Sequence, residues 1–165
     1  MKRDNFIFFL IAITVIILDQ ASKLVIARSI HYYESISVIN GFFNLVNVTN
    51  RGMAFGLMNR PNAGMSLYFL IAVTIIAIIM IIVWFTTLKQ SDRKLLFGLS
   101  LILGGAAGNL IDRIRLKGVI DFIDIHIGSY HWPAFNVADS AITVGAIWIA
   151  VLIVFLNPTK SGEAT

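Results

Sequence analysis

Cysteine is absent from the 165 residues, and charged side chains make up only 13% of them. The first absence excludes disulfides, thiolate metal ligands and a cysteine nucleophile. The second excludes an ordinary water-soluble domain, in which about a quarter of the residues are charged. Because 58% of the residues are hydrophobic, the chain also lacks the polar bias that disorder requires. This composition predicts a single membrane-embedded domain over residues 1–165.

Familiar catalytic and cofactor motifs are missing as well. The three histidines, His31, His126 and His131, show no H-x-x-x-H spacing, and there is no cysteine, so we expect no metal site. There is no serine-nucleophile elbow and no glycine loop of a nucleotide site, and we expect no cofactor. The basic residues behind the net charge of +4 form no stripe with interleaved aromatics, which argues against nucleic acid as a partner. A basic chain this apolar favours membrane lipids as partners.

Long apolar runs are the main feature of the sequence. Four of them approach the roughly 20 residues that a bilayer requires: 6–27, 65–88, 95–113 and 139–156. We expect the first to be retained as a helix, because it lacks a small-x-small cleavage pattern and three further spans follow. The sequence therefore predicts a mainly α membrane protein with four transmembrane helices.

Four spans place both termini on one side of the membrane. Six basic residues fall on the terminal side and six on the other, so the positive-inside count is a tie. The short connection that contains Arg93 and Lys94 is denser in charge, and on this basis we expect cytoplasmic termini.

The two connections on the far side, 30–62 and 116–138, carry most of the remaining polar sequence. Asn40-Gly41 interrupts a β-branched and aromatic run, which is a strong hairpin signal. The segment 118–127 alternates as an extended strand, and Asp121 is the one polar side chain on an otherwise apolar face. We expect a small sheet at the membrane surface, with Asp124 the more hydrated of the two aspartates.

Two patterns lie inside the spans. Asp19 and Lys23 are four residues apart and can pair on one helix face, as a structural salt bridge or as part of a site. Gly104 and Gly108 have the G-x-x-x-G spacing that lets another helix approach closely. Small residues also begin the fourth span, so we expect the third and fourth helices to pack tightly together.

That packing brings two aspartates to the same membrane surface. Asp121 follows the third span and Asp139 begins the fourth, so both lie near one boundary. Two such carboxylates can share acid and base roles, as in aspartic proteases. The alternatives are a helix N-cap for Asp139 and a solvated interfacial position for Asp121. The residues alone leave this choice open.

Five blocks in chain order resemble those of bacterial lipoprotein signal peptidases (signal peptidase II), which are aspartic peptidases. The blocks are DQASK from Asp19, NRGMAFG from Asn50, GGAAGNLIDR from Gly104, GVIDFI from Gly118 and FNVADS from Phe135. This resemblance implies four transmembrane helices, cytoplasmic termini in the bacterial inner membrane and an extracytoplasmic β-cradle beside the active site. It implies an intramembrane endopeptidase that cuts diacylglyceryl-modified prolipoproteins just before the lipidated cysteine.

The resemblance also implies roles for particular residues. Asp121 and Asp139 match the catalytic pair. Residues that match substrate-binding or supporting positions are Asn50, Gly52, Asn109, Arg113, Asn136, Asp19 and Lys23. Two other classes remain as alternatives from the residues themselves: a small ion- or proton-coupled carrier, suggested by ionisable groups within spans, and a structural assembly subunit, suggested by the glycine face.

Overall fold

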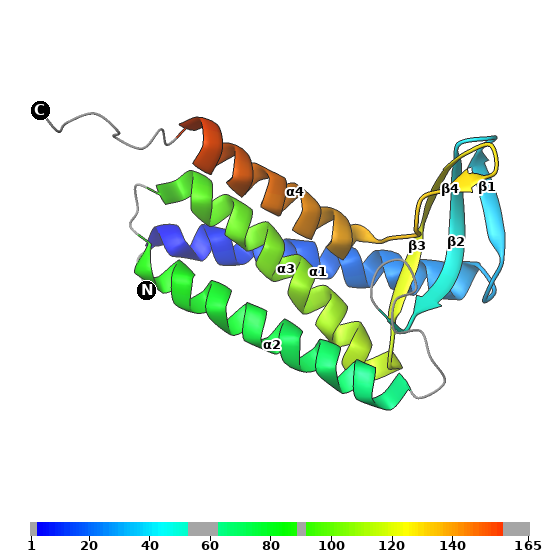
Figure 1. The fold of residues 1–165 in the computed structure, drawn as a ribbon, viewed down its shortest axis with the longest axis horizontal. Coiled ribbons are helices and arrows are strands. Elements are labelled where there is room, and N and C mark those ends of the chain that lie inside the picture. The colour runs from blue at the N-terminus through cyan, green and yellow to red at the C-terminus, as the bar shows by residue number, and fades with distance from the viewer. Residues whose placement is uncertain (1–2, 53–62, 89–91, 157–165) are drawn as a thin grey trace, which may run out of the picture.

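Four long helices and a small sheet make up the molecule in the computed structural model, which describes residues 3–52, 63–88 and 92–156. The elements in chain order are α1 (Arg3–Ser29), β1 (Ser35–Ile39), β2 (Phe43–Asn50), α2 (Ala63–Thr87), α3 (Arg93–Leu116), β3 (Val119–Ile127), β4 (Tyr130–His131) and α4 (Val137–Val151). A π-helical turn, Leu152–Leu156, continues α4. The helices lie side by side, and the sheet covers the end of the bundle opposite the start of α1 and the end of α4 (Figure 1).

All four helices are long and apolar enough to span a membrane, over Phe6–Ser29, Gly64–Thr87, Arg93–Leu116 and Val137–Phe155. This confirms the four predicted spans. Several helix boundaries differ from the prediction by a few residues, and two of these differences lie next to the site. Helix α3 runs past residue 113 until Lys117, in the left-handed region at φ 57°, donates its backbone N–H to the Arg113 carbonyl. Helix α4 begins two residues before 139, because the Asn136 side chain caps it.

Helix α3 is the centre of the bundle. In its most apolar stretch 56% of the residues are buried, against 6% in α2, so α2 lies at the periphery with most of its apolar surface free for lipid. The α3 side chains Leu96 and Leu99 pack with Phe8, Phe85 and Ile149 from the three other helices. The least apolar of the four spans is thus the one that its neighbours surround.

Glycines let the neighbouring helices approach α3 on two faces. A Cβ at Gly104 would lie 2.7 Å from the Ala12 carbonyl oxygen of α1, whereas a Cβ at Gly105 would overlap the Ala138 carbonyl of α4. The prediction that α3 and α4 pack tightly is confirmed, but its assignment of the Gly104 face to this contact is wrong. Gly98 and Gly105 are about two turns apart and both face α4. Gly104 precedes Gly105 by one residue, or about 100° around the helix, and so faces α1.

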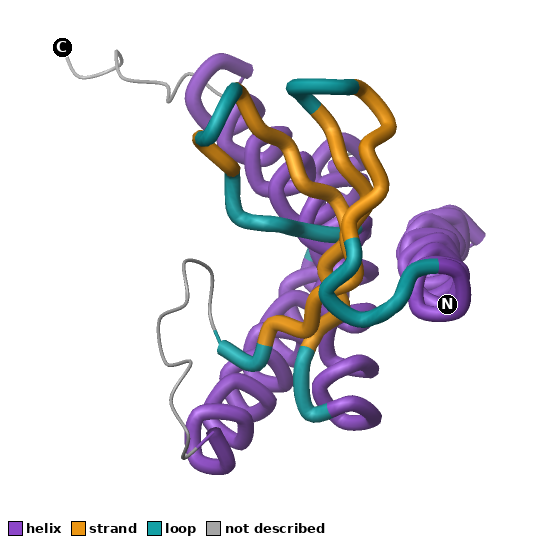
Figure 2. The backbone as a smooth tube through the Cα atoms, turned by 90° about the vertical axis from the view of Figure 1, so that its right-hand side faces the viewer, coloured by secondary structure: helices purple, strands orange, loops and turns teal. Residues whose placement is uncertain are grey.

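The sheet is antiparallel in the order β1-β2-β3-β4. The turn at Asn40-Gly41, with Gly41 at φ 78°, joins β1 to β2 and confirms the predicted hairpin. Strand β3 confirms the extended segment and pairs Asp121 with Val48 of β2. Phe122 of β3 packs on Ile26 of α1 and on Ile30, which directly follows this helix, and this contact fixes the sheet against the bundle. Figure 2 shows the strands crossing that end.

Asp124 is nearly as buried as Asp121, at 8% against 3% exposure. Its carboxylate accepts hydrogen bonds from Asn44 at 2.9 Å and from the His131 ring at 2.8 Å. Both partners belong to the sheet. Asp124 is the more exposed of the two aspartates, as expected, but only by this small margin. Part of the expected surface region, residues 53–62, lies outside the described residues.

Candidate active site

A cavity of about 1100 Å³ opens where the bundle meets the sheet. The ends of β2 and α3, the start of β3, the loop 132–135 and the first two turns of α4 line it. The predicted site residues in this lining are Asn50, Gly52, Asn109, Arg113, Asp121 and Asp139. Asp19, Lys23 and Asn136 are buried behind the cavity wall. The tertiary structure thus brings together residues from five segments of the chain.

Asp121 reaches the cavity from the third position of β3 and is 3% exposed. Its Oδ1 atom accepts a hydrogen bond of 2.7 Å from Nδ2 of Asn136. Burial raises the pKa of Asp121 to about 7, and the neighbouring Asp139 carboxylate adds to the rise; hydrogen bonds from Asn50 and Asn136 and the Lys23 charge oppose it. Asp121 therefore holds a proton up to near-neutral pH, which a carboxyl must do to act as an acid there.

Asp139 lies in the first turn of α4, where the helix dipole favours a negative charge. Its backbone N–H donates to Oδ1 of Asn136 at 2.9 Å, so Asn136 and not Asp139 is the helix N-cap. The N-cap alternative for Asp139 is therefore wrong. The Asp139 side chain does not cap the helix; it accepts a hydrogen bond of 2.8 Å from Nδ2 of Asn109.

Two side-chain amides connect the two carboxylates. Nδ2 of Asn136, which donates to Asp121, also lies 3.4 Å from Oδ1 of Asn109, and Asn109 donates to Asp139. Oδ1 of Asn109 accepts from the Lys23 ammonium at 3.0 Å. Because an ammonium can only donate, this contact points the amide oxygen toward Lys23 and the NH₂ group toward Asp139.

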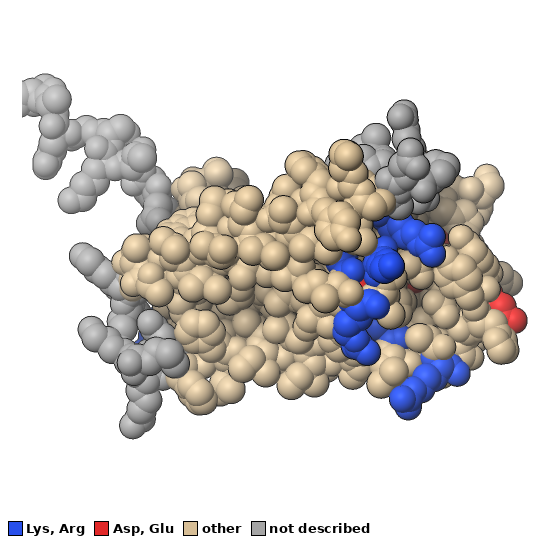
Figure 3. Space-filling view, turned by 90° about the horizontal axis from the view of Figure 1, so that it is seen from below, with Lys and Arg blue, Asp and Glu red and all other residues tan. Residues whose placement is uncertain are grey.

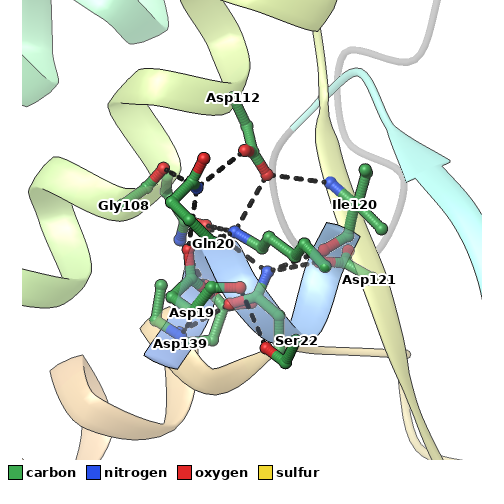
Figure 4. Close-up of polar contacts among 12 residues, drawn as sticks. Asp19, Gln20, Ser22, Gly108, Asp112, Ile120, Asp121 and Asp139 are labelled. Atoms are coloured by element: carbon green, nitrogen blue, oxygen red, sulfur yellow. Dashed lines mark hydrogen bonds and ion pairs between the residues drawn. The ribbon is translucent and has the colours of Figure 1, made fainter. Parts of the chain in front are cut away.

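A buried polar cluster supports these amides from behind (Figure 4). Lys23 lies 2.8 Å from Asp19 and 2.9 Å from Asp112, and with Asn109 these three acceptors match its three N–H groups. Gln20 donates to Asp112 at 2.9 Å. The predicted pairing of Asp19 with Lys23 is confirmed. Loss of one member of such a buried pair costs about 3–5 kcal/mol, because its partner stays charged and unpaired.

Asp19 also holds the start of α4. Its Oδ1 atom accepts the backbone N–H of Ala138 at 3.0 Å, next to Asp139. A Cβ at Gly108 would lie 2.6 Å from Oδ2 of Asp19, so only glycine leaves room for this carboxylate. The cluster thereby links α1, α3 and α4 at the point where the Asp139 side chain enters the cavity.

Sequence reasoning missed two supporting residues and one wall of the cavity. Asp112 lies three residues after Asn109, a spacing that places both on one helix face, but the sequence does not indicate its contacts with Lys23 and Gln20. Gln20 follows Asp19 directly. The loop 132–135 lines the cavity because Phe135 exchanges backbone hydrogen bonds with Ile123, a pairing that no local pattern in the sequence predicts.

Residues 3–52, 63–88 and 92–156 contain no group of three or more histidine or acidic side chains that could hold a metal ion. The polar side chains that line the cavity carry carboxylates, amides, hydroxyls, the Trp132 indole and the guanidinium of Arg113.

The fold and the cavity define a multi-pass membrane protein with paired carboxylates at one end of its helix bundle. The family model for signal peptidase (SPase) II matches residues 11–155. The chain therefore belongs to the signal peptidase II family and is a membrane-embedded peptidase. This family removes signal peptides from prolipoproteins, and membership in it decides against the carrier and the assembly subunit.

Several known proteins are similar along almost the whole chain. The lipoprotein signal peptidase of Oleidesulfovibrio alaskensis is 48% identical over 93% of this chain and 97% of its own length. That of Syntrophus aciditrophicus is 42% identical over 98% of this chain and 100% of its own length. A bacterial membrane enzyme solved by the in meso method is 34% identical, with a TM-score of 0.81 over 96% of this chain and 93% of that one.

Proposed function

We propose that Asp121 and Asp139 are the catalytic pair, and that the chain is one peptidase domain over residues 1–165. The observation that carries the proposal is the amide chain through Asn136 and Asn109, which binds one oxygen of each carboxylate inside a single cavity. Like charges this near each other favour a state with one proton between the two groups.

The proposed reaction assigns a different role to each carboxyl group. Protonated Asp121 donates a hydrogen bond to the scissile carbonyl oxygen and polarises it. Ionised Asp139, supported by Asn109 and by the N-terminal end of α4, takes a proton from water while the water oxygen attacks the carbonyl carbon. Collapse of the tetrahedral intermediate breaks the C–N bond, and the proton held by Asp139 passes to the leaving amine.

Arg113, Asn50 and Gly52 are proposed to hold the substrate. Arg113 is half-buried in the cavity wall, where its N–H groups can donate to backbone carbonyls of an extended peptide. Oδ1 of Asn50 accepts the Gly52 backbone N–H at 3.0 Å, which stabilises the turn after β2 beside the cavity. Asn109 and Asn136 orient the carboxylates, and Asp19 and Lys23 orient the amides.

The proposed substrates are prolipoproteins that carry diacylglycerol on the cysteine after the scissile bond. Ile142 and Val144 of α4 line the cavity next to its polar residues, within a span whose outer surface is free for lipid. A lipid-modified residue can therefore stay in the bilayer while its backbone reaches the aspartates. We place the protein in the bacterial inner membrane, with cytoplasmic termini and the cavity toward the extracytoplasmic surface.

Cleavage of a lipidated precursor in reconstituted membranes tests the pair. Asp121→Asn and Asp139→Asn should each lower kcat by at least about a thousandfold, since removal of one essential acid or base costs a large part of the catalysis. Asp124→Asn is the matched control, because this aspartate lies on the same strand but outside the cavity lining. Near-normal cleavage by either of the first two variants would refute the catalytic pair.

The same assay with unlipidated precursor tests the substrate class. We expect the wild-type protein to cleave the lipidated form much faster, because the unmodified peptide lacks the group that holds it in the bilayer. Equal rates for the two forms would refute the proposed requirement for the diacylglyceryl group, but they would not contradict the catalytic pair.

A further inference from the structure

Basic side chains gather on one face of the molecule where the helix bundle meets the sheet (Figure 3). Four of them are exposed there: Arg28 in the last turn of α1, Arg51 after β2, Arg115 in the last turn of α3, and Lys117 directly after it. We call these four residues the basic collar. A Cβ at Gly118 would lie 3.3 Å from Cγ of Arg51, so the stem of Arg51 lies over the chain next to Lys117.

Acidic side chains at this end do not neutralise the collar. Within residues 3–52, 63–88 and 92–156, no ion pair joins a collar residue to a carboxylate. Glu34 is the one exposed acidic side chain described at this end, and it accepts the backbone N–H of His31. The other carboxylates there are buried or partly buried within the cavity region and the sheet: Asp19, Asp112, Asp121, Asp124 and Asp139.

Apolar side chains are interleaved with the collar. Ile114 and Leu116, which are 62% and 46% exposed, alternate with Arg115 and Lys117 at the end of the α3 span. Trp132, at the cavity wall, is 54% exposed. Such a mixture is unfavourable in water but suits a membrane interface, where apolar surface enters the acyl region and long cationic side chains reach the phosphates.

We infer that the basic collar binds the phosphate groups of anionic phospholipids and holds the cavity mouth against the membrane surface. Phosphates of this kind lie at the depth where the spans end, and each basic residue near an anionic surface contributes about 1 kcal/mol, or about fivefold in affinity. The binding does not depend on the catalytic roles proposed for the aspartates.

Thermal unfolding of the full-length protein in dodecyl maltoside micelles tests the inference. Added phosphatidylglycerol should raise the Tm, because a ligand that binds the folded state stabilises it, whereas phosphatidylcholine should not. Arg115→Gln/Lys117→Gln should weaken the apparent lipid affinity on the order of twenty-five-fold, from about fivefold per charge. Arg93→Gln/Lys94→Gln is the matched control, since it removes the same two charges from the other end of α3.

Binding of the lipid and binding of free phosphate give different results. A Tm response to phosphatidylglycerol that is equal in the two double variants would overturn the inference. An equal rise with inorganic phosphate would also overturn it and assign a free-phosphate site. A second readout is native mass spectrometry: wild type and control should retain phosphatidylglycerol, and Arg115→Gln/Lys117→Gln should lose it. In the same measurement Asp139→Asn should retain phosphatidylglycerol although it loses cleavage. Loss of cleavage and loss of lipid binding are therefore distinguishable.

Discussion

At the scale of single residues, the two aspartates differ because their surroundings differ. Asp121 comes from a strand and is buried, whereas Asp139 lies in the first turn of a helix and receives an N–H from Asn109. Lys23 is 2% exposed, and its ammonium contacts Asn109, Asp19 and Asp112, so under the proposal it acts through the Asn109 amide and not on the substrate. Each of the two carboxylates is thus bonded to an amide that a further polar group holds.

The raised pKa of Asp121 predicts how cleavage depends on pH. The proposed mechanism requires protonated Asp121, so kcat/KM should fall by about tenfold per pH unit above the pKa of about 7. The measurement is a pH profile with lipidated precursor in vesicles. A flat profile well into the alkaline range would contradict the role of Asp121 as the acid.

Stability gives a readout of the same group that is independent of activity. The pKa of Asp121 in the folded state is raised above 3.8. Its contribution to the free energy of unfolding is therefore fully present below pH 3.8 and is lost as the pH rises to about 7. The wild-type Tm, relative to that of Asp121→Asn, should fall over this range and then stay level. Asp124→Asn should show a constant offset, because burial raises the pKa of Asp124 but hydrogen bonds from His131 and Asn44 outweigh it and lower the value.

At the scale of elements, the contact between α3 and α4 determines where Asp139 lies. Gly105 lets the α4 backbone approach so closely that a side chain there would overlap the Ala138 carbonyl, one residue before Asp139. Gly105→Ala should therefore displace the start of α4, cost about 1–3 kcal/mol of stability and lower kcat. Unfolding in detergent and the cleavage assay measure the two effects.

Gly64→Ala is the control for this substitution. Gly64 lies in the first turn of α2, and a Cβ there would meet nothing within 4 Å. Alanine is the better helix former, so this variant should keep or slightly raise the Tm and leave cleavage unchanged. If Gly105→Ala behaved in the same way, the close approach of α4 would not be what positions Asp139.

At the scale of the whole molecule, orientation in the membrane is the main prediction. Because the chain has no cysteine, a single Ser129→Cys or Lys94→Cys provides a unique label. Both positions are exposed, Ser129 in the turn between β3 and β4 and Lys94 at the start of α3. An impermeant maleimide should label Ser129→Cys in intact spheroplasts, and Lys94→Cys only after lysis. The opposite pattern would place the termini outside.

The tie in the positive-inside count has a structural explanation at this scale. Four of the six basic residues counted on the far side form the collar, and a fifth, Arg113, lines the cavity. If the collar binds lipid phosphates and Arg113 binds substrate, as proposed above, these five residues are placed for binding, and their number is a poor guide to orientation. A count of charges treats every basic residue alike, and only the fold shows which ones have another partner.

The amino-acid sequence by itself determined the class of fold, the four spans, the β1–β2 hairpin and the Asp19–Lys23 pair. Each depends on local hydrophobicity, turn chemistry or spacing along one element, which the order of residues specifies directly. The tertiary structure decided which glycines face which helix, that Asn136 caps α4, and that Lys23 meets Asp112 and Asn109. These contacts join elements up to 119 residues apart, as in the bond from Ala138 to Asp19, and only close packing of the helices brings such partners together.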